Sequence, residues 1–205
     1  MSDDLERRLA GEAPAAGPLD LDRFRQAFVR RADEAGLVDV AYGQLESPLG
    51  TLTAFVTPAG LVRLSYPGEP IERQLEELAS RVSPRILAAP ERTDAARRQL
   101  DEYFAGRRQR FDVPVDWRLL HGFREAVLRA TAAIPFGSVA SYRSIAAAAG
   151  SPNAYRAAGN ALGSNPIPIV VPCHRVLHSG GGLGGYTGGL DRKRYLLGLE
   201  GVLGA

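Results

Sequence analysis

Apolar and polar positions in the first half of the chain follow the spacings of short strands and amphipathic helices. Strands are expected in four apolar or β-branched segments, the first three separated by Ser/Pro/Gly turns: residues 38–46, 51–57, 61–66 and 110–115. Helices are expected where apolar residues recur at helical spacing: residues 20–35, 72–82 and 93–105. Thr93 is the expected N-cap of the last helix, and Gly106 its stop. The pattern predicts a small antiparallel sheet with helices.

The second half of the chain is predominantly helical in pattern. Helices are expected over four segments: residues 121–134, 142–149, 153–163 and 191–199. Ser141 can cap the second helix, and Ser151-Pro152 supplies the N-cap and first-turn residues of the third. Two short helices separated by a glycine and a serine cap resemble a helix-turn-helix. After them we expect a short buried strand at Val170-Val171 and a glycine-rich loop over 180–189.

These elements divide an α/β (α+β) chain into three parts. Residues 1–36 form a partly helical N-terminal extension, and residues 1–19, rich in Ala, Gly and Pro, are expected to be loosely ordered. Residues 37–115 are expected to form the sheet-containing α/β domain. Residues 116–205 are expected to form a second domain built on the helix pair.

Composition places the chain among water-soluble globular proteins. Of its 205 residues, 45% are hydrophobic and 23% are charged. No apolar run approaches the roughly 20 residues that span a bilayer, so no membrane association is expected. The acidic start Met1-Ser2-Asp3-Asp4 is unlike a secretory signal, and one cysteine forms no internal disulfide. Cytoplasmic residence in a reducing compartment is the simplest interpretation.

The net charge of +2 conceals an asymmetry between the two halves. Residues 117–205 contain nine basic and three acidic residues, a charge of +6, so residues 1–116 must carry −4. A basic half joined to an acidic half suggests a polyanionic partner for the basic half. A scattered, solvated surface explains the same numbers about equally well.

Cys173 is the only cysteine, and it follows Val170-Val171-Pro172 and precedes His174-Arg175. A lone cysteine is most often a small buried hydrophobe. Here Pro172 ends the preceding strand, and two basic residues follow the sulfur. A thiolate needs such an electropositive setting to form near neutral pH. The neighbours therefore favour a reactive thiol.

Several spaced motifs, in one order, resemble the O6-alkylguanine-DNA alkyltransferases, the methylated-DNA–protein-cysteine methyltransferases. The motifs lie within residues 121–201: Phe136-Gly137, Ser141-Tyr142, Ile145-Ala146, Ala154-Tyr155-Arg156-Ala157-Ala158-Gly159, Asn165-Pro166-Ile167-Pro168, Pro172-Cys173-His174-Arg175-Val176, Gly185-Tyr186-Thr187-Gly188-Gly189-Leu190, Leu196-Leu197 and Glu200-Gly201. Residues 38–115 fit the family's N-terminal domain only in outline. The resemblance implies a ribonuclease-H-like N-terminal domain and a winged-helix-type DNA-binding domain that carries the cysteine.

The resemblance implies direct, single-turnover DNA repair. The alkyl group of O6-alkylguanine in duplex DNA, and less efficiently that of O4-alkylthymine, would pass irreversibly to Cys173 after the base is flipped out of the helix. A soft thiolate suits a displacement at carbon. No cofactor is implied, because the lesion itself is the alkyl donor. The partner is double-stranded DNA carrying alkylated guanine, bound by a monomer, and cooperative assembly on DNA stays open.

By resemblance, each motif contributes a residue to the site. Cys173 would pass its proton through water to His174, which Glu200 holds, and Asn165 would brace the turn before the cysteine. Tyr142, Val176, Tyr186 and Thr187 would contact the flipped base, Tyr142 also pressing on the phosphate. Arg156 would fill the vacated space in the duplex, on a recognition helix whose Ala157 and Gly159 also face DNA. Tyr155 departs from the small residue common in the family at that position, and it would stack on DNA or simply pack.

Three other functions compete with this one. A zinc site at Cys173, His174 and His178 is disfavoured, because residues four apart on an extended chain are about 13 Å apart. A cysteine hydrolase would need a separate base such as His121 and would turn over many times. A DNA-binding regulator or lesion sensor would not need the cysteine.

Overall fold

The computed structural model describes residues 21–203, in two compact units divided at residue 37. In the first unit, helix α2 (Leu21–Glu34) confirms the helix predicted over 20–35. The loosely ordered segment predicted for residues 1–19 lies outside the described residues. The second unit contains a sheet half, residues 38–117, and a helical half, residues 118–203. The domain boundary expected between residues 115 and 116 stays a prediction, because both halves fall within this one unit.

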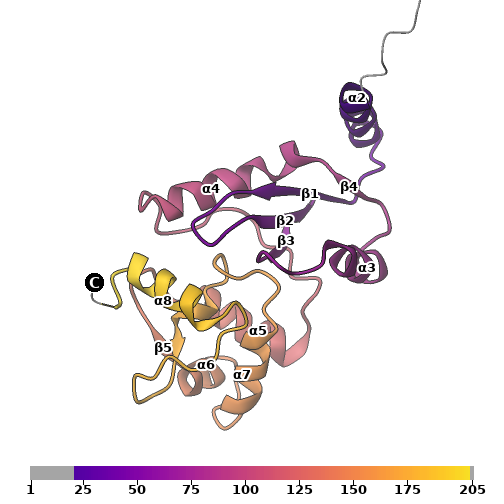
Figure 1. The fold of residues 1–205 in the computed structure, drawn as a ribbon. Coiled ribbons are helices and arrows are strands. Elements are labelled where there is room, and N and C mark those ends of the chain that lie inside the picture. The colour runs from indigo at the N-terminus through magenta and orange to yellow at the C-terminus, as the bar shows by residue number, and fades with distance from the viewer. Residues whose placement is uncertain (1–20, 204–205) are drawn as a thin grey trace, which may run out of the picture. The chain divides into compact units, whose positions relative to one another are not determined.

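The sheet half contains a four-stranded sheet of order β3-β2-β1-β4 (Figure 1). Strands β1 (Val40–Leu45), β2 (Leu52–Thr57) and β3 (Gly60–Ser65) confirm the first three predicted strands and pair antiparallel. The fourth strand is β4 (Ile86–Ala88), which pairs parallel to β1 and was not predicted. The strand predicted at 110–115 is wrong, because this segment makes only a single bridge, between Val115 and Leu61.

Helices cover both faces of the sheet. Helix α3 (Ile71–Arg81) covers the face of Val40, Phe55 and Val62, where its Leu78 is fully buried. The 3₁₀ helix η1 (Pro90–Thr93) and helix α4 (Asp94–Phe104) follow β4. Side chains alternate along β1, so Gly43 faces away from α3. A Cβ at Gly43 would lie 2.8 Å from Thr93 Oγ1 and 2.9 Å from Pro90, which shows how closely η1 packs on that face.

Thr93 occupies the N-cap position of α4 as predicted, but its side chain does not cap the helix. Its hydroxyl donates to Pro90 O at 2.7 Å within η1 and makes no capping hydrogen bond to α4. The preceding 3₁₀ turn already satisfies the first backbone groups of the helix.

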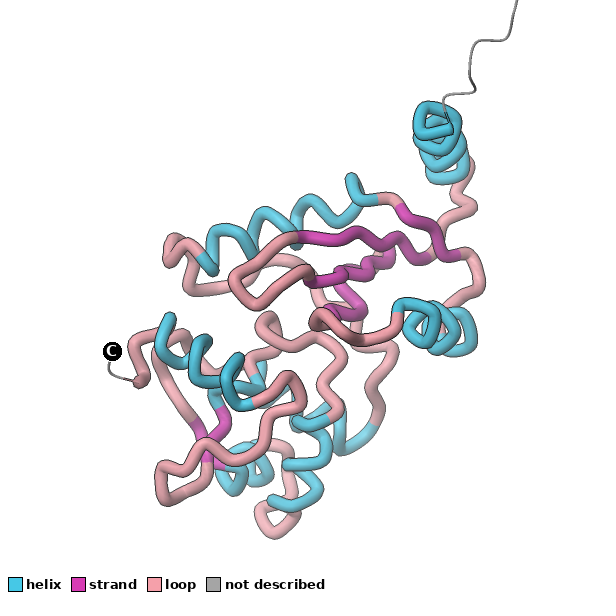
Figure 2. Tube along the Cα trace, viewed as in Figure 1, coloured by secondary structure: helices cyan, strands magenta, loops and turns pink. Residues whose placement is uncertain are grey.

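The helical half contains α5 (Gly122–Ala132), α6 (Tyr142–Ala148), α7 (Tyr155–Gly163) and α8 (Leu190–Leu199), all close to the predicted helices (Figure 2). Ser141 caps α6 as predicted, in a reciprocal capping box with Ser144. Ser151-Pro152 does not cap α7. The Ala154 amide donates to Ser151 O in a separate turn, and the helix begins at Tyr155.

The chain around the cysteine is not the predicted strand. Residues Cys173–Arg175 form a 3₁₀ turn, η2, and the only strand nearby is β6 (Val176–Leu177), which pairs parallel with β5 (Ala140–Ser141). Upstream, the Val171 amide donates to Ile167 O, so Val170-Val171 lies in a turn. Ile169 in this turn has φ 72°, which costs a β-branched residue about 1–3 kcal/mol. Such local strain persists where surrounding contacts over-determine the conformation.

A backbone hydrogen bond joins the two halves. The Leu64 amide, on β3 of the sheet half, donates to Pro166 O, 2.9 Å away, in the segment that precedes Cys173. The sheet is therefore held against the segment that positions Cys173.

Within residues 21–203, every helix is too short or too polar to cross a membrane.

Candidate active site

Cys173 lies at the start of η2, where two cavities meet. Its side chain is buried, with only 8% of the residue exposed. The first cavity, of about 530 Å³, lies beside α7; the second, of about 490 Å³, lies against the sheet half. Both volumes are in the range of small-molecule sites. The sulfur therefore faces a hollow large enough for a base.

Asn165 anchors the cysteine turn with both ends of its amide. Its Nδ2 donates to Cys173 Sγ at 3.1 Å and to Val171 O at 2.8 Å. Its Oδ1 accepts from the Ile167 amide at 3.0 Å. The bracing expected of Asn165 is thus seen in its contacts, and one of them is made directly to the sulfur.

The electropositive group near the thiol is Lys193, and not the neighbours His174 and Arg175. Burial raises the pKa of Cys173, while the Asn165 hydrogen bond and the charge of Lys193 oppose this rise. Lys193, the only lysine of the chain, is fully buried on α8 and donates to Val176 O at 2.7 Å and to Leu183 O. Burial lowers the pKa of Lys193 to about 8, so it is largely charged at pH 7. The expectation that Arg175 activates the thiol is therefore wrong.

Arg175 and His174 instead point at Glu200. Glu200 Oε1 lies 2.8 Å from His174 Nε2, and its two oxygens accept from Arg175 at 2.8 and 2.9 Å. The Tyr103 hydroxyl, from α4 of the sheet half, donates to Oε1 at 2.7 Å. All four side chains are buried. Burial opposes ionisation of Glu200, but the hydrogen bonds from His174 and Arg175 lower its pKa to about 2.

The contact with Glu200 sets the tautomer of His174. A carboxylate only accepts hydrogen bonds, so Nε2 carries the proton. Burial lowers the pKa of His174, against the raising effect of Glu200, which leaves a neutral ring at pH 7. Its Nδ1 then presents a free lone pair, and among the described residues this buried atom has no hydrogen-bond partner. His174 is therefore arranged as a proton acceptor.

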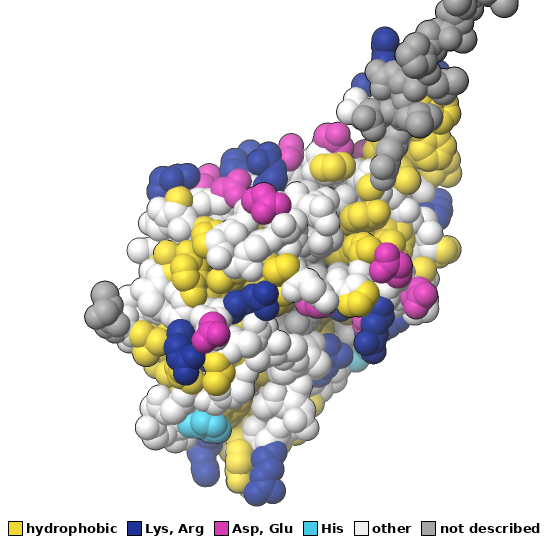
Figure 3. Space-filling view, viewed as in Figure 1, with side chains coloured by type: hydrophobic (Ala, Val, Ile, Leu, Met, Phe, Trp, Pro, Cys, Tyr) yellow, Lys and Arg dark blue, Asp and Glu magenta, His cyan; other side chains and the backbone are white. Residues whose placement is uncertain are grey.

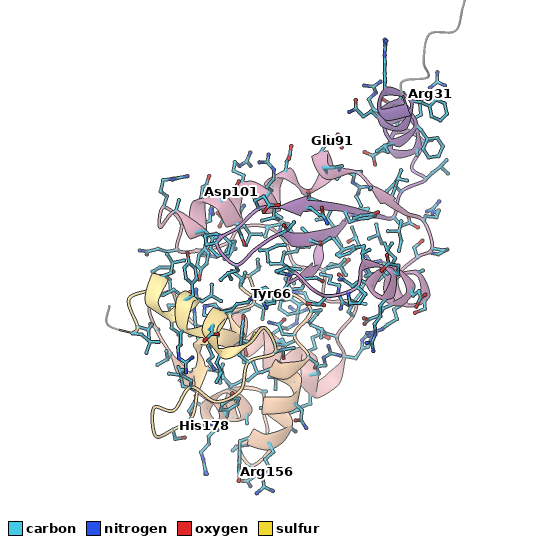
Figure 4. All side chains as sticks on the ribbon, in the orientation of Figure 1. Arg31, Tyr66, Glu91, Asp101, Arg156 and His178 are labelled. Carbon is cyan, nitrogen blue, oxygen red and sulfur yellow. The ribbon has the colours of Figure 1, made fainter. Side chains whose placement is uncertain are left out.

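Most of the residues predicted to contact the base or DNA line the cavity beside α7. Those present are Tyr142, Arg156, Gly159, Tyr186 and Thr187, together with Tyr155, His178 and Cys173. Thr187 Oγ1 donates to Gly163 O and ties the glycine loop to the end of α7. Arg156 lies at the far end of the helical half from the sheet (Figure 4), where Arg side chains gather around α6 and α7 (Figure 3).

Two predicted contact residues lie outside that cavity lining. Val176 is fully buried, and its carbonyl accepts from Lys193. Ala157 is exposed on α7. Contact of Val176 with the base and of Ala157 with DNA stays a prediction.

Tyr155 lies between two arginines at the mouth of this cavity. Its ring centroid is 5.4 Å from the guanidinium carbon of Arg143 and 5.8 Å from that of Arg156, within cation–π range. The residue is 38% exposed. Of its two expected roles, the packing contact is seen, and stacking on DNA stays a prediction.

Three residues of the site carried no interpretable signal in the sequence: Lys193, Tyr103 and Tyr66. Tyr103 is a fully buried side chain of α4. Tyr66, at the end of β3, lies 2.6 Å hydroxyl to hydroxyl from Tyr186. Tyr66 and Tyr103 come from the sheet half and reach the site across more than 90 residues of sequence.

Neither the thiol nor its neighbours form a metal site. Within residues 21–203, His, Cys, Asp and Glu side chains nowhere gather in threes as metal ligands would. His174 faces Glu200, and the His178 ring packs against Tyr142 at 5.2 Å between centroids.

The fold and site define a class of protein in which a helix pair flanks a base-sized cavity that ends at a buried, hydrogen-bonded thiol. Comparisons place it more narrowly. Residues 40–117 match the 6-O-methylguanine DNA methyltransferase ribonuclease-like domain, and residues 122–202 the DNA binding domain of the same family.

Related proteins match most of the length of this chain. The methylated-DNA–protein-cysteine methyltransferase of Mycolicibacterium paratuberculosis is 42% identical over 78% of this chain and 92% of its own. The crystal structure of Mycobacterium tuberculosis OGT in complex with DNA is 40% identical, with TM-score 0.67, over 78% of this chain and 92% of that one. A Methanococcus jannaschii O6-methylguanine DNA methyltransferase is 27% identical, with TM-score 0.53, over 80% and 95%.

The chain belongs to the 6-O-methylguanine DNA methyltransferase family, whose members repair alkylated DNA by transferring the alkyl group to a cysteine. The predicted fold class, a ribonuclease-H-like sheet followed by a DNA-binding domain, is confirmed.

Proposed function

We propose that this chain removes the alkyl group from O6-alkylguanine in duplex DNA and keeps it permanently on Cys173. The observation that carries the proposal is the thiol itself. It lines a cavity beside the recognition helix α7. The Asn165 amide donates a hydrogen bond to the sulfur, the charge of Lys193 favours the thiolate, and the neutral imidazole of His174 follows in sequence.

The reaction is a displacement at carbon in which every proton has a place. The S–H proton passes, through a water, to the free Nδ1 of His174, and Glu200 stabilises the imidazolium that forms. The sulfur lone pair attacks the alkyl carbon, and the C–O6 bond breaks. The electron pair leaves with the guanine, which takes up, through water, the proton that the imidazolium releases, so that His174 returns to its neutral form. The thioether product has no easy hydrolytic exit, so each molecule reacts once.

DNA is the partner that this cavity requires, since a stacked base cannot reach a buried sulfur. In this proposal Arg156 enters the space that the base vacates, because a flat guanidinium with five donors can stack and pair there. Tyr142, Tyr186 and Thr187 wall the base pocket. Ala157 and Gly159 allow close approach of α7 to the duplex. O4-alkylthymine is a second substrate in this proposal, and it reacts less efficiently than O6-alkylguanine. The protein acts as a monomer in the cytoplasm.

Stoichiometry tests this function. Mixed with excess duplex carrying labelled O6-methylguanine, the protein is expected to accept one methyl group per molecule and then stop. Cys173→Ala is expected to accept none, while its DNA affinity in fluorescence anisotropy stays within about two-fold of the parent because the sulfur makes no phosphate contact. Continued release of methanol would instead identify a hydrolase, and lesion removal by Cys173→Ala would refute the proposal.

Replacing Arg156 tests base extrusion. Arg156→Ala is expected to slow methyl transfer from DNA by about 5- to 150-fold, the equivalent of the 1–3 kcal/mol of a good arginine–base contact. Reaction of the same variant with iodoacetamide should be unchanged, since the thiol is intact. Arg97→Ala, which removes an exposed, ion-paired arginine from α4, is the matched control. If the two variants slow methyl transfer equally, Arg156 acts only through its positive charge and does not replace the extruded base.

A further inference from the structure

The end of β3 brings a phenol of the sheet half to the thiol pocket. Tyr66 is buried, with 7% exposed, and its hydroxyl lies 2.6 Å from that of Tyr186 in the glycine loop, 120 residues away. Figure 4 places Tyr66 between the sheet and the helical half. Tyr186 and Cys173 line both cavities together, whereas Tyr66 lines only the second. Tyr66 therefore lines one of the two thiol cavities itself and reaches the other through Tyr186.

Either hydroxyl can be the donor in this hydrogen bond. Tyr186 lines both cavities with Cys173, and it is one of the groups that oppose the rise in the pKa of Cys173 caused by burial, after Asn165, Lys193 and the backbone of Cys173. A phenol has one proton. When Tyr66 donates, the Tyr186 oxygen is the acceptor, and the Tyr186 proton is free to point at the sulfur. The two hydroxyls then form a chain that ends at Sγ, and donors in a chain polarise one another.

The ring of Tyr66 is held from two sides, and its backbone is held as well. The Arg192 guanidinium lies over it at 4.8 Å, and Arg192 also donates to Gly188 O at 2.8 Å. A Cβ at Gly188 would lie 2.7 Å from the Tyr66 ring and 2.8 Å from the Tyr186 ring, so both rings press against bare backbone. The Tyr66 amide donates to Glu69 at 3.1 Å. The hydroxyl is therefore held in place without help from substrate.

We propose that Tyr66 is a positioning residue for the alkyl-transfer reaction: through its hydrogen bond to Tyr186, the sheet half prepares the Cys173 thiol for attack. The DNA-dependent part of this inference rests on the proposed function. The part that concerns the thiol does not, because Cys173 is the only cysteine and any thiol reagent reports on it alone.

The main variant is Tyr66→Phe, which removes one oxygen and keeps the ring. Tyr42→Phe is the matched control, since Tyr42 lies in the same sheet with its ring stacked on Phe55 at 5.5 Å. Besides Tyr186, the thiol faces Lys193 on α8, Tyr142 on α6 and its neighbour His174, and these groups are unchanged in both variants. A difference between the two variants therefore reports on the Tyr66 hydroxyl.

Two rates are measured between pH 6 and 9: reaction with iodoacetamide, and single-turnover methyl transfer from O6-methylguanine DNA. Tyr66→Phe is expected to slow both at pH 7 by about five-fold, the value of one net hydrogen bond, and to move the pH–rate curve to higher pH. Tyr42→Phe should match the parent. Tyr66→Phe should add nothing in a Tyr186→Phe background, because Tyr66 acts through Tyr186.

The inference is overturned if Tyr66→Phe behaves as Tyr42→Phe does, or if its effect adds in full to that of Tyr186→Phe. Should Tyr66→Phe fail to fold, 3-fluorotyrosine at position 66 tests the same point with the opposite sign, because a more acidic phenol is a stronger donor and should speed both reactions. If the parent takes no methyl group from DNA, the proposed function fails, while the iodoacetamide rates still decide the role of Tyr66.

Discussion

Replacing Glu200 with glutamine is expected to lower the free energy of unfolding by about 3–5 kcal/mol. Glu200 is the shared acceptor for Tyr103, His174 and Arg175, and all four side chains are buried. The amide keeps the shape but removes the charge, so it leaves the Arg175 guanidinium without a buried counter-ion. It also removes the charged partner of His174, and methyl transfer should slow by about 100-fold, within the range of general-base contributions.

Urea unfolding measures the stability change, and Glu125→Gln is the matched control. Glu125 pairs with Arg129 on the exposed surface of α5, at i,i+4 spacing and 2.8 Å. Losing such a pair should cost less than about 0.5 kcal/mol. If Glu200→Gln proves no more damaging than Glu125→Gln, the buried cluster does not organise the site.

The pH dependence of this difference has a definite sign. The folded-state pKa of Glu200, about 2, is below the value of about 4.3 for an unfolded glutamate. Its ionised form therefore stabilises the fold in full above about pH 4.3, and that contribution is lost as the pH falls towards 2. The stability gap between the parent and Glu200→Gln should narrow across this window.

Replacing Asn165 with aspartate is expected to have the second large effect. The change swaps the Nδ2 donor for an oxygen that faces Val171 O and the sulfur, at positions 2.8 and 3.1 Å from the present nitrogen. A carboxylate there opposes thiolate formation, so the iodoacetamide rate at pH 7 should fall by about 10- to 1,000-fold. The loss of the donor to the buried turn should also cost about 1–3 kcal/mol of stability.

Asn160→Asp is the control for this substitution, because Asn160 is exposed on α7 and iodoacetamide needs no DNA contact. The control should react at the rate of the parent. If both aspartate variants react alike, the amide of Asn165 has no part in the reactivity of the thiol.

Local chemistry made much of the fold predictable. The three antiparallel strands follow apolar segments bounded by Ser/Pro/Gly turns, and α6 begins where Ser141 and Ser144 form a capping box. Two capping signals in the sequence, at Thr93 and Ser151, do not produce caps, because these residues form other hydrogen bonds in the fold. Thr93 bonds within η1, and Ser151 closes a separate turn before α7 begins at Tyr155.

The cysteine turn shows the limit of local interpretation. Two valines before a proline are typical of a strand, but the three hydrogen bonds of Asn165 and the 3₁₀ turn at Cys173 fold this segment back instead. The pairing of His174 with Glu200, 2.8 Å apart, was predicted from the family motifs. The placement of Arg175 was not, because an arginine beside a reactive cysteine gives no sign of the carboxylate that it pairs with 25 residues later.

Contacts between the halves were the least predictable part of the site. Tyr66 and Tyr103 are ordinary inward-facing aromatics in their own segments, and only the packing of the sheet against the helical half brings their hydroxyls to Tyr186 and Glu200. Lys193 is a lone lysine on an otherwise charged helix, and no sequence pattern reveals its full burial.

Intact-mass spectrometry after mixing with an O6-methylguanine duplex tests the central claim most directly. The protein is expected to gain the mass of one methylene group, and peptide mapping should place that group on Cys173. An unchanged mass while the lesion disappears, or a methyl group located on any other residue, would contradict it.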